Sequence, residues 1–345
     1  MTRTTTRVSV IGAGAWGTAL AMVLGRKGTP DFQYDVRLWA HEPEVSESIG
    51  RCRINERFLP GFRLSESIVA TSDLGAALAG AEIVVSVMPS QHCRSLFERM
   101  APWLRPETLF VSCTKGLENE TLMRMTEVIA DVMRSRGFTP RVAALSGPSF
   151  AKEVARGDPT AVTVASVDDE VTRIVQQAFN DSRFRVYTND DVIGVELGGA
   201  LKNIIAIAAG VCDGLGLGHN SVAALITRGL AEVARLAVAC GGRLDTMAGL
   251  AGLGDLVLTC TGDLSRNRTV GVELGKGRVL RDIMEGMHGA VAEGVFTTRA
   301  AVGLARKKKV EMPITEQMLA ILENGKSPRQ AIEDLMTRAA RSENY

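Results

Sequence analysis

Cysteine and aromatic residues are scarce in this sequence. Only 6 of its 345 residues are cysteines, and no two of them form a CxxC pair. A disulfide framework is not expected in a chain this long with so few cysteines, so we predict reduced thiols and a cytoplasmic location. Aromatic residues make up only 5% of the chain, which argues against a stacking platform for single-stranded nucleic acid.

An excess of charge of one sign is also lacking. The 40 Lys and Arg residues nearly balance the 39 Asp and Glu residues, so the formal net charge is +1. This balance excludes a uniformly basic protein that coats nucleic acid, and no nucleic-acid partner is predicted. The four histidines, at positions 41, 92, 219 and 288, show no metal-ligand spacing, so no metal site is predicted either.

Long uninterrupted hydrophobic runs are missing as well. The uncharged stretch Val8–Leu24 follows Arg3 and Arg7, and in this it resembles a signal peptide. Three glycines interrupt the stretch, and it falls short of the roughly 18 residues expected of a membrane span. The other apolar run, Ile204–Cys212, is shorter still. We therefore expect no export and no integral contact with a membrane.

The two halves of the chain differ in their hydrophobic patterns. Up to about residue 190, short strand-like runs alternate with helical patterns, and apolar runs such as Ile83–Val87 are typical of strands buried on both faces. This alternation predicts a doubly wound parallel sheet of the Rossmann type. Beyond residue 190 only helical patterns follow. We predict an α/β plus all-α protein, with an α/β domain at residues 1–190 and a helical domain at residues 191–345.

Gly12, Gly14 and Gly17 form a GxGxxG motif between the first predicted strand and the first predicted helix. This is the context in which the motif binds dinucleotides. The first glycine permits a tight turn, the second lets the backbone approach a pyrophosphate, and the third lets the helix pack on the strand. Free amides at the start of the helix then face the phosphates. The motif therefore predicts a dinucleotide-binding domain.

The end of the second predicted strand indicates which dinucleotide is bound. An acidic residue at this point would accept a hydrogen bond from the ribose 2′-hydroxyl of NAD. No carboxylate stands at Ala40 or His41, and Glu42 follows. His41 could accommodate a 2′-phosphate, with Arg37 or Arg53 nearby. We predict NADPH or NADH as the cofactor, with NADPH favoured.

Six further motifs follow the glycine loop in order along the chain. They are Cys113–Leu117, Leu145–Ala151, Ala200–Asn203, Leu250–Leu256, Ser265–Asn267 and Glu293–Val295. Together with Gly12–Leu20 they resemble the bacterial NAD(P)-dependent glycerol-3-phosphate dehydrogenases over about residues 5 to 335. The resemblance implies interconversion of dihydroxyacetone phosphate and sn-glycerol 3-phosphate, which supplies glycerophospholipid synthesis. It also implies a homodimer.

Lys202 is the general acid/base that this resemblance implies. The surrounding sequence supports the same role, because Lys202 is the only basic residue of the apolar helical run Val195–Cys212. A lysine in apolar surroundings tends to have a lowered pKa. It can therefore donate a proton to the oxygen on the reacting carbon, and remove it in the reverse reaction.

The resemblance also implies the other site residues. Those implied to bind substrate are Lys115, Gly147, Ser149, Asp255, Ser265, Arg266 and Asn267. Those implied to bind the cofactor, besides the three glycines and His41, are Ala15, Trp16, Lys115, Ala151, Arg266, Val291 and Glu293. A hydroxyl, a guanidinium and an amide at Ser265–Asn267 suit a phosphate dianion, with Arg268 as the alternative arginine.

Several alternatives stay open at this point. Asp255 could orient Lys202, hold a substrate hydroxyl, or cap a helix that begins at Leu256. Without the resemblance, Glu293 would be interpreted as a solvated acid. The run Arg306–Lys309 is typical of a solvated helix end. The same architecture would also suit a dehydrogenase of hydroxy acids, or a nucleotide-sensing protein without catalysis.

Overall fold

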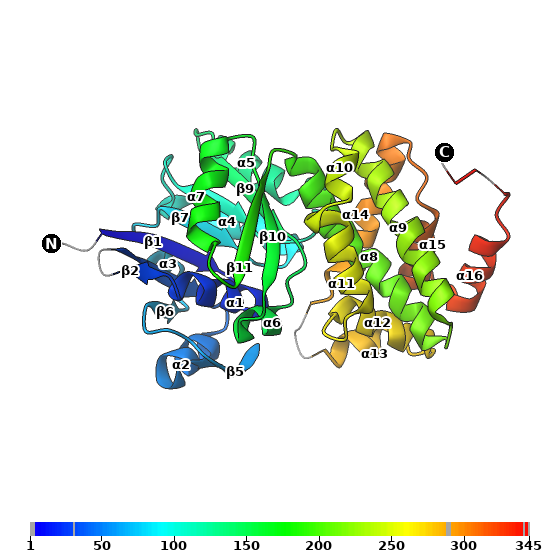
Figure 1. Ribbon diagram of the computed structural model, residues 1–345, viewed down its shortest axis with the longest axis horizontal. Coiled ribbons are helices and arrows are strands. Elements are labelled where there is room, and N and C mark those ends of the chain that lie inside the picture. The colour runs from blue at the N-terminus through cyan, green and yellow to red at the C-terminus, as the bar shows by residue number, and fades with distance from the viewer. Residues whose placement is uncertain (1–3, 30–31, 288–290, 341, 344–345) are drawn as a thin grey trace.

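The computed structural model describes residues 4–29, 32–287, 291–340 and 342–343 (Figure 1). Within these residues, nine strands form one sheet in the order β11-β10-β9-β8-β7-β1-β3-β2, with β6 paired to β3. The strands of this sheet are β1 (Thr4–Ile11), β2 (Gly28–Thr29), β3 (Phe32–Trp39), β6 (Ile68–Thr71), β7 (Ile83–Ser86), β8 (Leu109–Ser112), β9 (Arg141–Ser146), β10 (Thr160–Ala165) and β11 (Phe184–Asn189). Strands β4 (Ile54–Asn55) and β5 (Leu59–Arg63) form a separate hairpin.

The sheet is predominantly parallel, as the alternation of strands and helices predicts. β1 pairs in parallel with both β3 and β7, and β7, β8 and β9 continue in the same direction. Two pairs are antiparallel, β9 with β10 and β2 with β3. The sequence did not indicate these two reversals, because a hydrophobic strand pattern carries no information about direction. β1 lies where the strand order reverses, which is where doubly wound sheets open a ligand crevice.

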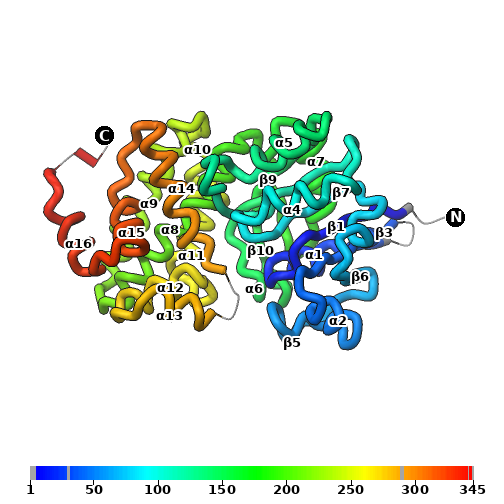
Figure 2. Tube along the Cα trace, turned by 180° about the vertical axis from the view of Figure 1, so that it is seen from behind, coloured from blue at the N-terminus to red at the C-terminus, as the bar shows by residue number. Residues whose placement is uncertain are grey.

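Helices cover both faces of this sheet (Figures 1 and 2). They are α1 (Ala15–Gly25), α2 (Pro43–Cys52), α3 (Leu74–Leu78), α4 (Cys93–Met100), α5 (Met125–Ser135), α6 (Ala151–Arg156) and α7 (Asp169–Phe179). Successive side chains of a strand point to opposite faces. Val10 therefore lies in one core with α1 and α7, whereas the next residue, Ile11, lies in the other core with α3, α4 and α5.

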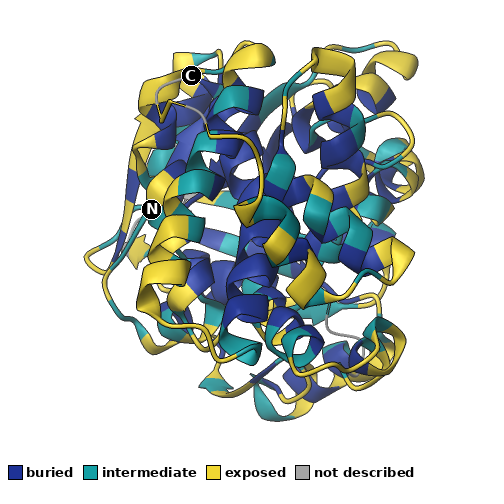
Figure 3. Cartoon of the chain, turned by 90° about the vertical axis from the view of Figure 1, so that its right-hand side faces the viewer, coloured by how far each residue is buried: buried dark blue, intermediate teal, exposed yellow. Residues whose placement is uncertain are grey.

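Beyond β11 the described chain is helical, as predicted. The helices are α8 (Val192–Gly214), α9 (His219–Ala239), α10 (Leu244–Met247), α11 (Asp255–Thr261), α12 (Arg266–Gly275), α13 (Leu280–Glu285), α14 (Glu293–Lys308), α15 (Pro313–Asn324) and α16 (Pro328–Met336), and a π-helical turn, η3 (Leu250–Gly254), precedes α11. α8 runs through the middle of this group and is buried over most of its length. Figure 3 shows buried residues inside the group and exposed residues around it.

α8 is also the one helix in the described part of the chain that is long and apolar enough to cross a membrane. Of its most apolar window, 89% is buried inside the protein. The neighbouring helices α9, α11, α12 and α14 supply that cover. The apolar character of α8 is therefore that of a core helix.

Glycines let α8 and α12 approach each other closely. A Cβ atom on Gly210 of α8 would lie 2.0 Å from the carbonyl oxygen of Arg268. A Cβ atom on Gly271 of α12 would lie 1.9 Å from the carbonyl oxygen of Ile207. The backbones of α8 and α12 are therefore in direct contact at this crossing. The close contact brings the start of α12 beside the part of α8 that carries Lys202.

We predict that Gly210→Ala destabilises the protein, because its new methyl group must push α12 away from α8. Overpacking of this kind lowers the free energy of unfolding by about 1–3 kcal/mol. Gly50→Ala is the matched control, since Gly50 is also helical but has open space around its Cβ position. Denaturant titration measures both changes. Equal stability of the two variants would show that the crossing tolerates a wider separation.

Candidate active site

A buried carboxylate between two lysines forms the centre of the site. Asp255, the first residue of α11, is 1% exposed. Its Oδ2 lies 2.6 Å from Nζ of Lys115, and its Oδ1 lies 3.1 Å from Nζ of Lys202. Lys115 comes from the loop after β8, whereas Lys202 comes from the middle of α8. Residues 140 positions apart in the sequence therefore meet at one carboxylate.

Lys202 is enclosed by polar groups within an apolar helix. Its Nζ donates to Oγ1 of Thr259 at 2.7 Å and to Oδ1 of Asn203 at 3.1 Å. Burial lowers the pKa of Lys202 to about 8, Asp255 opposes this shift, and the second lysine adds to it. A lysine with this pKa can both hold and release a proton near neutral pH.

Of the three interpretations of Asp255, the geometry agrees with the one in which its carboxylate orients Lys202. The N-cap position of α11 belongs to Gly254, and the carboxylate of Asp255 faces the two lysines. The two positive charges exceed the one negative charge. The centre of the site is therefore electropositive, which favours a negatively charged ligand or a developing alkoxide.

The loop after β9 contacts the same centre. Gly147 adopts a φ of +140°, which an L side chain rarely adopts, and a Cβ atom there would lie 2.9 Å from Cα of Val162. Its carbonyl oxygen accepts hydrogen bonds from Nζ of Lys115 and from Oγ of Ser149, both at 2.9 Å. The glycine thus turns a carbonyl toward the lysine. Ser149, which the resemblance implies to bind substrate, lies beside this carbonyl.

Two asparagines connect the helices around Lys202. Oδ1 of Asn203 accepts from Nδ2 of Asn267 at 3.0 Å as well as from Lys202. Oδ1 of Asn267 in turn accepts from the backbone N–H of Gly294 at 2.9 Å. These bonds join α8, α12 and α14. Both asparagines are buried, so each hydrogen bond has a defined geometry.

The three residues proposed for phosphate binding differ in whether their side chains already have partners within the protein. Oγ of Ser265 caps α12 by accepting from the N–H of Arg268 at 3.2 Å. Arg266 is exposed, and its Nη1 donates to the carbonyl of Val291 at 3.3 Å. Within the described chain its guanidinium makes no ion pair. The alternative arginine, Arg268, is held by Asp213 at 2.8 Å and by Asp263 at 3.0 Å.

Glu293 is not a freely solvated acid. It begins α14, and its carboxylate accepts from the backbone N–H of Ser90 at 3.0 Å and from the Ser90 hydroxyl at 2.6 Å. Burial raises the pKa of Glu293, partly offset by these bonds. The contact joins the turn after β7 to α14, across 203 positions of sequence. The resemblance put Glu293 in the site, and the isolated sequence did not.

The glycine loop has the shape that a dinucleotide pyrophosphate requires. Gly12 has a φ of +120°, and a Cβ atom there would lie 2.6 Å from the carbonyl oxygen of Val87. A Cβ on Gly17 would overlap the carbonyl of Gly12, whereas the Cβ position of Gly14 faces open space. No side chain of the described residues caps the start of α1. Its first amides are therefore free for an anion.

The neighbouring residues predicted to bind the cofactor also have surroundings that suit a dinucleotide. Trp16 is partly buried, and its indole Nε1 has no hydrogen-bond partner in the described chain. Ala15 and Ala151 pack against the same core, at the starts of α1 and α6. His41 is exposed just beyond β3, with its ring centroid 5.9 Å from that of Trp39. The loop, α1 and the end of β3 therefore fit an NAD(P) dinucleotide.

Sequence reasoning missed three polar side chains at this site. Thr259 bonds to Lys202, Asn203 connects that lysine to α12, and Ser90 binds Glu293. Thr259 lies four residues after Asp255, so helical spacing could have placed the two on one face. Asn203 was quoted within a motif but not assigned to the site. No local signal marks Ser90.

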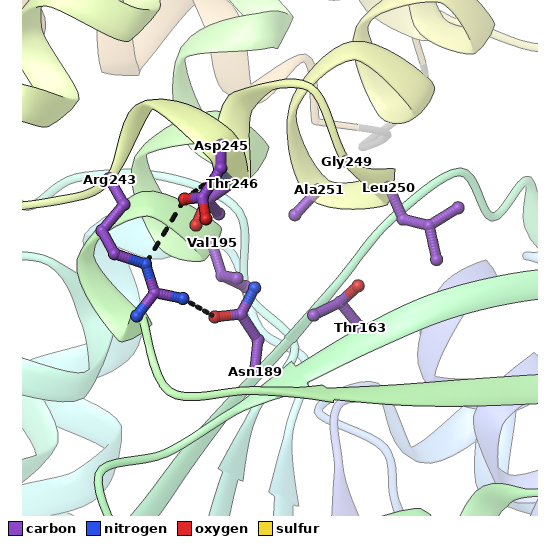
Figure 4. Close-up of a pocket in the computed structure, with 9 residues that line it drawn as sticks. All are labelled: Thr163, Asn189, Val195, Arg243, Asp245, Thr246, Gly249, Leu250 and Ala251. Atoms are coloured by element: carbon purple, nitrogen blue, oxygen red, sulfur yellow. Dashed lines mark hydrogen bonds and ion pairs between the residues drawn. The ribbon is translucent and has the colours of Figure 1, made fainter.

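A separate small pocket lies beside η3 (Figure 4). Its volume is about 120 Å³, and β10, β11, α8 and residues 243–251 line it. The side chain of Arg243 reaches across it but is already paired, with Asp190 at 2.6 Å and Asp245 at 3.3 Å. None of the site residues predicted from the sequence lines this pocket, so it is distinct from the lysine–aspartate centre.

These features together define a two-part dehydrogenase, in which a dinucleotide loop and a buried lysine come from different parts of the chain. Two family models agree with the assignment to this class of dehydrogenase. Residues 7–172 match the NAD-dependent glycerol-3-phosphate dehydrogenase N-terminus, and residues 191–333 match the C-terminus of the same family. The chain belongs to the glycerol-3-phosphate dehydrogenase family.

Individual relatives agree with this assignment over nearly the whole chain. Glycerol-3-phosphate dehydrogenase [NAD(P)+] of Koribacter versatilis is 65% identical and that of Acidobacterium capsulatum is 57% identical. Each alignment covers 98% of this chain, and 98% and 99% of the relatives. The crystal structure of glycerol-3-phosphate dehydrogenase from Coxiella burnetii is 42% identical, with a TM-score of 0.90 over 97% of this chain and 99% of that one.

Proposed function

We propose that this chain catalyses reversible hydride transfer between NAD(P)H and dihydroxyacetone phosphate, with sn-glycerol 3-phosphate as the reduced product. The observation that carries the proposal is Lys202, a buried lysine with a pKa of about 8 at the electropositive centre. The nicotinamide supplies the hydride to carbon 2 when the cofactor is bound.

Lys202 acts as the general acid in this proposal. As the carbonyl of dihydroxyacetone phosphate is reduced, its oxygen takes a proton from Nζ of Lys202, which becomes neutral and is reprotonated from solvent. In the reverse direction neutral Lys202 removes the hydroxyl proton. Asp255 holds Nζ in place, and Lys115 adds positive charge beside the developing alkoxide.

Arg266 is the proposed ligand of the substrate phosphate. It is exposed and carries the guanidinium of this group that no carboxylate occupies in the described chain. A planar guanidinium binds phosphate oxygens in pairs. Asn267 and Ser265 position the start of α12, and they offer secondary contacts to the substrate phosphate.

The remaining assignments complete the proposal. We propose an α/β cofactor domain at residues 1–190 and a helical domain for substrate binding and catalysis at residues 191–345, supported by the end of β11 at Asn189 and the start of α8 at Val192. We also propose a homodimer, as the family resemblance implies. A cytoplasmic role in glycerophospholipid supply agrees with six cysteines that are all free thiols.

Lys202→Ala should lower kcat about 100-fold or more, because the proton donor is lost while the cofactor loop is untouched. Assays follow NADPH oxidation by dihydroxyacetone phosphate, and fluorescence titration follows NADPH binding, which should be unchanged. Lys307→Ala, an exposed lysine near the end of α14, is the control. A near-normal kcat in Lys202→Ala would refute the acid/base assignment.

Arg266→Ala should raise KM for dihydroxyacetone phosphate about tenfold or more, with a smaller effect on kcat, since a charge-assisted contact to phosphate is removed. Arg268→Ala is the matched variant, because two aspartates already occupy that guanidinium. Steady-state kinetics of both variants provide the measurement. The opposite ranking of the two KM values would assign the phosphate to Arg268.

The rate should depend on pH with opposite sign in the two directions. Reduction needs protonated Lys202, so its kcat should fall as pH rises through about 8, and oxidation should gain rate over the same range. Asp255 raises the pKa of Lys202, so Asp255→Asn should move both profiles to lower pH. Profiles that coincide for the two proteins would show that Asp255 does not influence the titrating group.

A further inference from the structure

A second hollow, whose lining includes none of Lys115, Lys202 and Asp255, is bordered by four arginines. It has a volume of about 510 Å³, and its lining includes Arg26, Arg63, Arg156 and Arg183. The single carboxylate among its lining residues is that of Glu66. The arginines come from four segments, at the ends of α1, β5 and α6 and just before β11. In Figure 1 the labels of α1, β5 and α6 lie close together in the lower half of the sheet domain.

Two of these arginines have an evident structural role. Arg26 directly follows α1, donates to the carbonyl of Val154 at 3.5 Å and lies 3.7 Å from Asp181. Arg156 ends α6 and pairs with Asp158. Cations are favourable at the C-terminal ends of helices, where the helix dipole is negative. These two guanidinium groups are therefore accounted for without a ligand.

Arg63 and Arg183 have no such role. Arg63 ends β5, and its nearest acid in the described chain is Glu66 at 3.6 Å. Both side chains are more than 70% exposed, so this pair contributes little, and Glu66 also lies 3.6 Å from Arg53. Arg183 makes no ion pair within the described residues. Its guanidinium packs on Gly157, where a Cβ atom would lie 2.5 Å from Nη1.

We propose that this pocket, called here the arginine pocket, binds an anion that carries two or more phosphate groups. Guanidinium groups bind phosphate oxygens in pairs. Among the lining arginines, Arg63 has only a weak, exposed ion pair and Arg183 has none within the described residues. A hollow among four segments suits a compact anion better than a flat membrane surface. The 11 residues of α1 separate the arginine pocket from the glycine loop by about 16 Å, so it is not the cofactor site.

Calorimetric titration with inorganic tripolyphosphate tests this proposal. The protein is first saturated with NADPH and sn-glycerol 3-phosphate, which cannot react with each other and which occupy the other phosphate sites. We expect saturable binding to one site. The double variant Arg63→Gln/Arg183→Gln should weaken this binding about tenfold or more, because two charge-assisted contacts are lost.

The matched control is Arg134→Gln/Arg281→Gln, which removes the same charge from exposed arginines that do not line the pocket. It should bind tripolyphosphate like the unmodified protein. Circular dichroism establishes that both double variants are folded. The absence of saturable binding, or equal losses in the two double variants, would overturn the proposal.

Sedimentation with phosphatidylglycerol vesicles separates a soluble anion from a lipid surface. The unmodified protein should stay in solution with these vesicles while it binds tripolyphosphate. If Arg63 and Arg183 are instead required for vesicle binding, and tripolyphosphate shows no saturable binding, these arginines face a membrane and the pocket proposal is wrong.

Discussion

The bond between Asp255 and two lysines is the constraint on which the site depends. Burial of a charged lysine is unfavourable and lowers its pKa. A nearby carboxylate opposes this shift. Asp255 does this for Lys202 in the helical part and contacts Lys115 in the sheet part at the same time. Because one carboxylate serves both, the two charges cannot be fully neutralised. The surplus positive charge sits where an alkoxide would form in the proposed reaction.

The packing of α8 explains why the surrounding groups are where they are. Its glycine contact with α12 lets backbone meet backbone, so Asn267 comes within hydrogen-bond distance of Asn203. Asn203 in turn accepts from Lys202. The packing of α8 against α12 therefore also determines the geometry of the site. A change at Gly210, which touches no site residue, would still displace the helix that carries Arg266.

Much of the fold could be predicted from the sequence, because its signals are local. The glycines at 12, 14 and 17 stand between a strand and a helix in the structure as in the sequence, and strand patterns end near residue 190. The direction of β10 could not be predicted, since it depends on how the chain returns to the sheet. The contact of Asp255 with Lys115 and that of Glu293 with Ser90 were beyond local reasoning, because these partners lie 140 and 203 residues away.

The shared carboxylate makes the position of the two parts of the molecule a determinant of proton affinity. Lys115 follows strand β8 of the sheet, whereas Asp255 and Lys202 lie on α11 and α8. Loss of the Lys115 contact would leave the carboxylate of Asp255 to Lys202 alone. The pKa of Lys202 then rises, and the group holds its proton more tightly. The distance between the sheet part and the helical part therefore helps to set the acidity of Lys202.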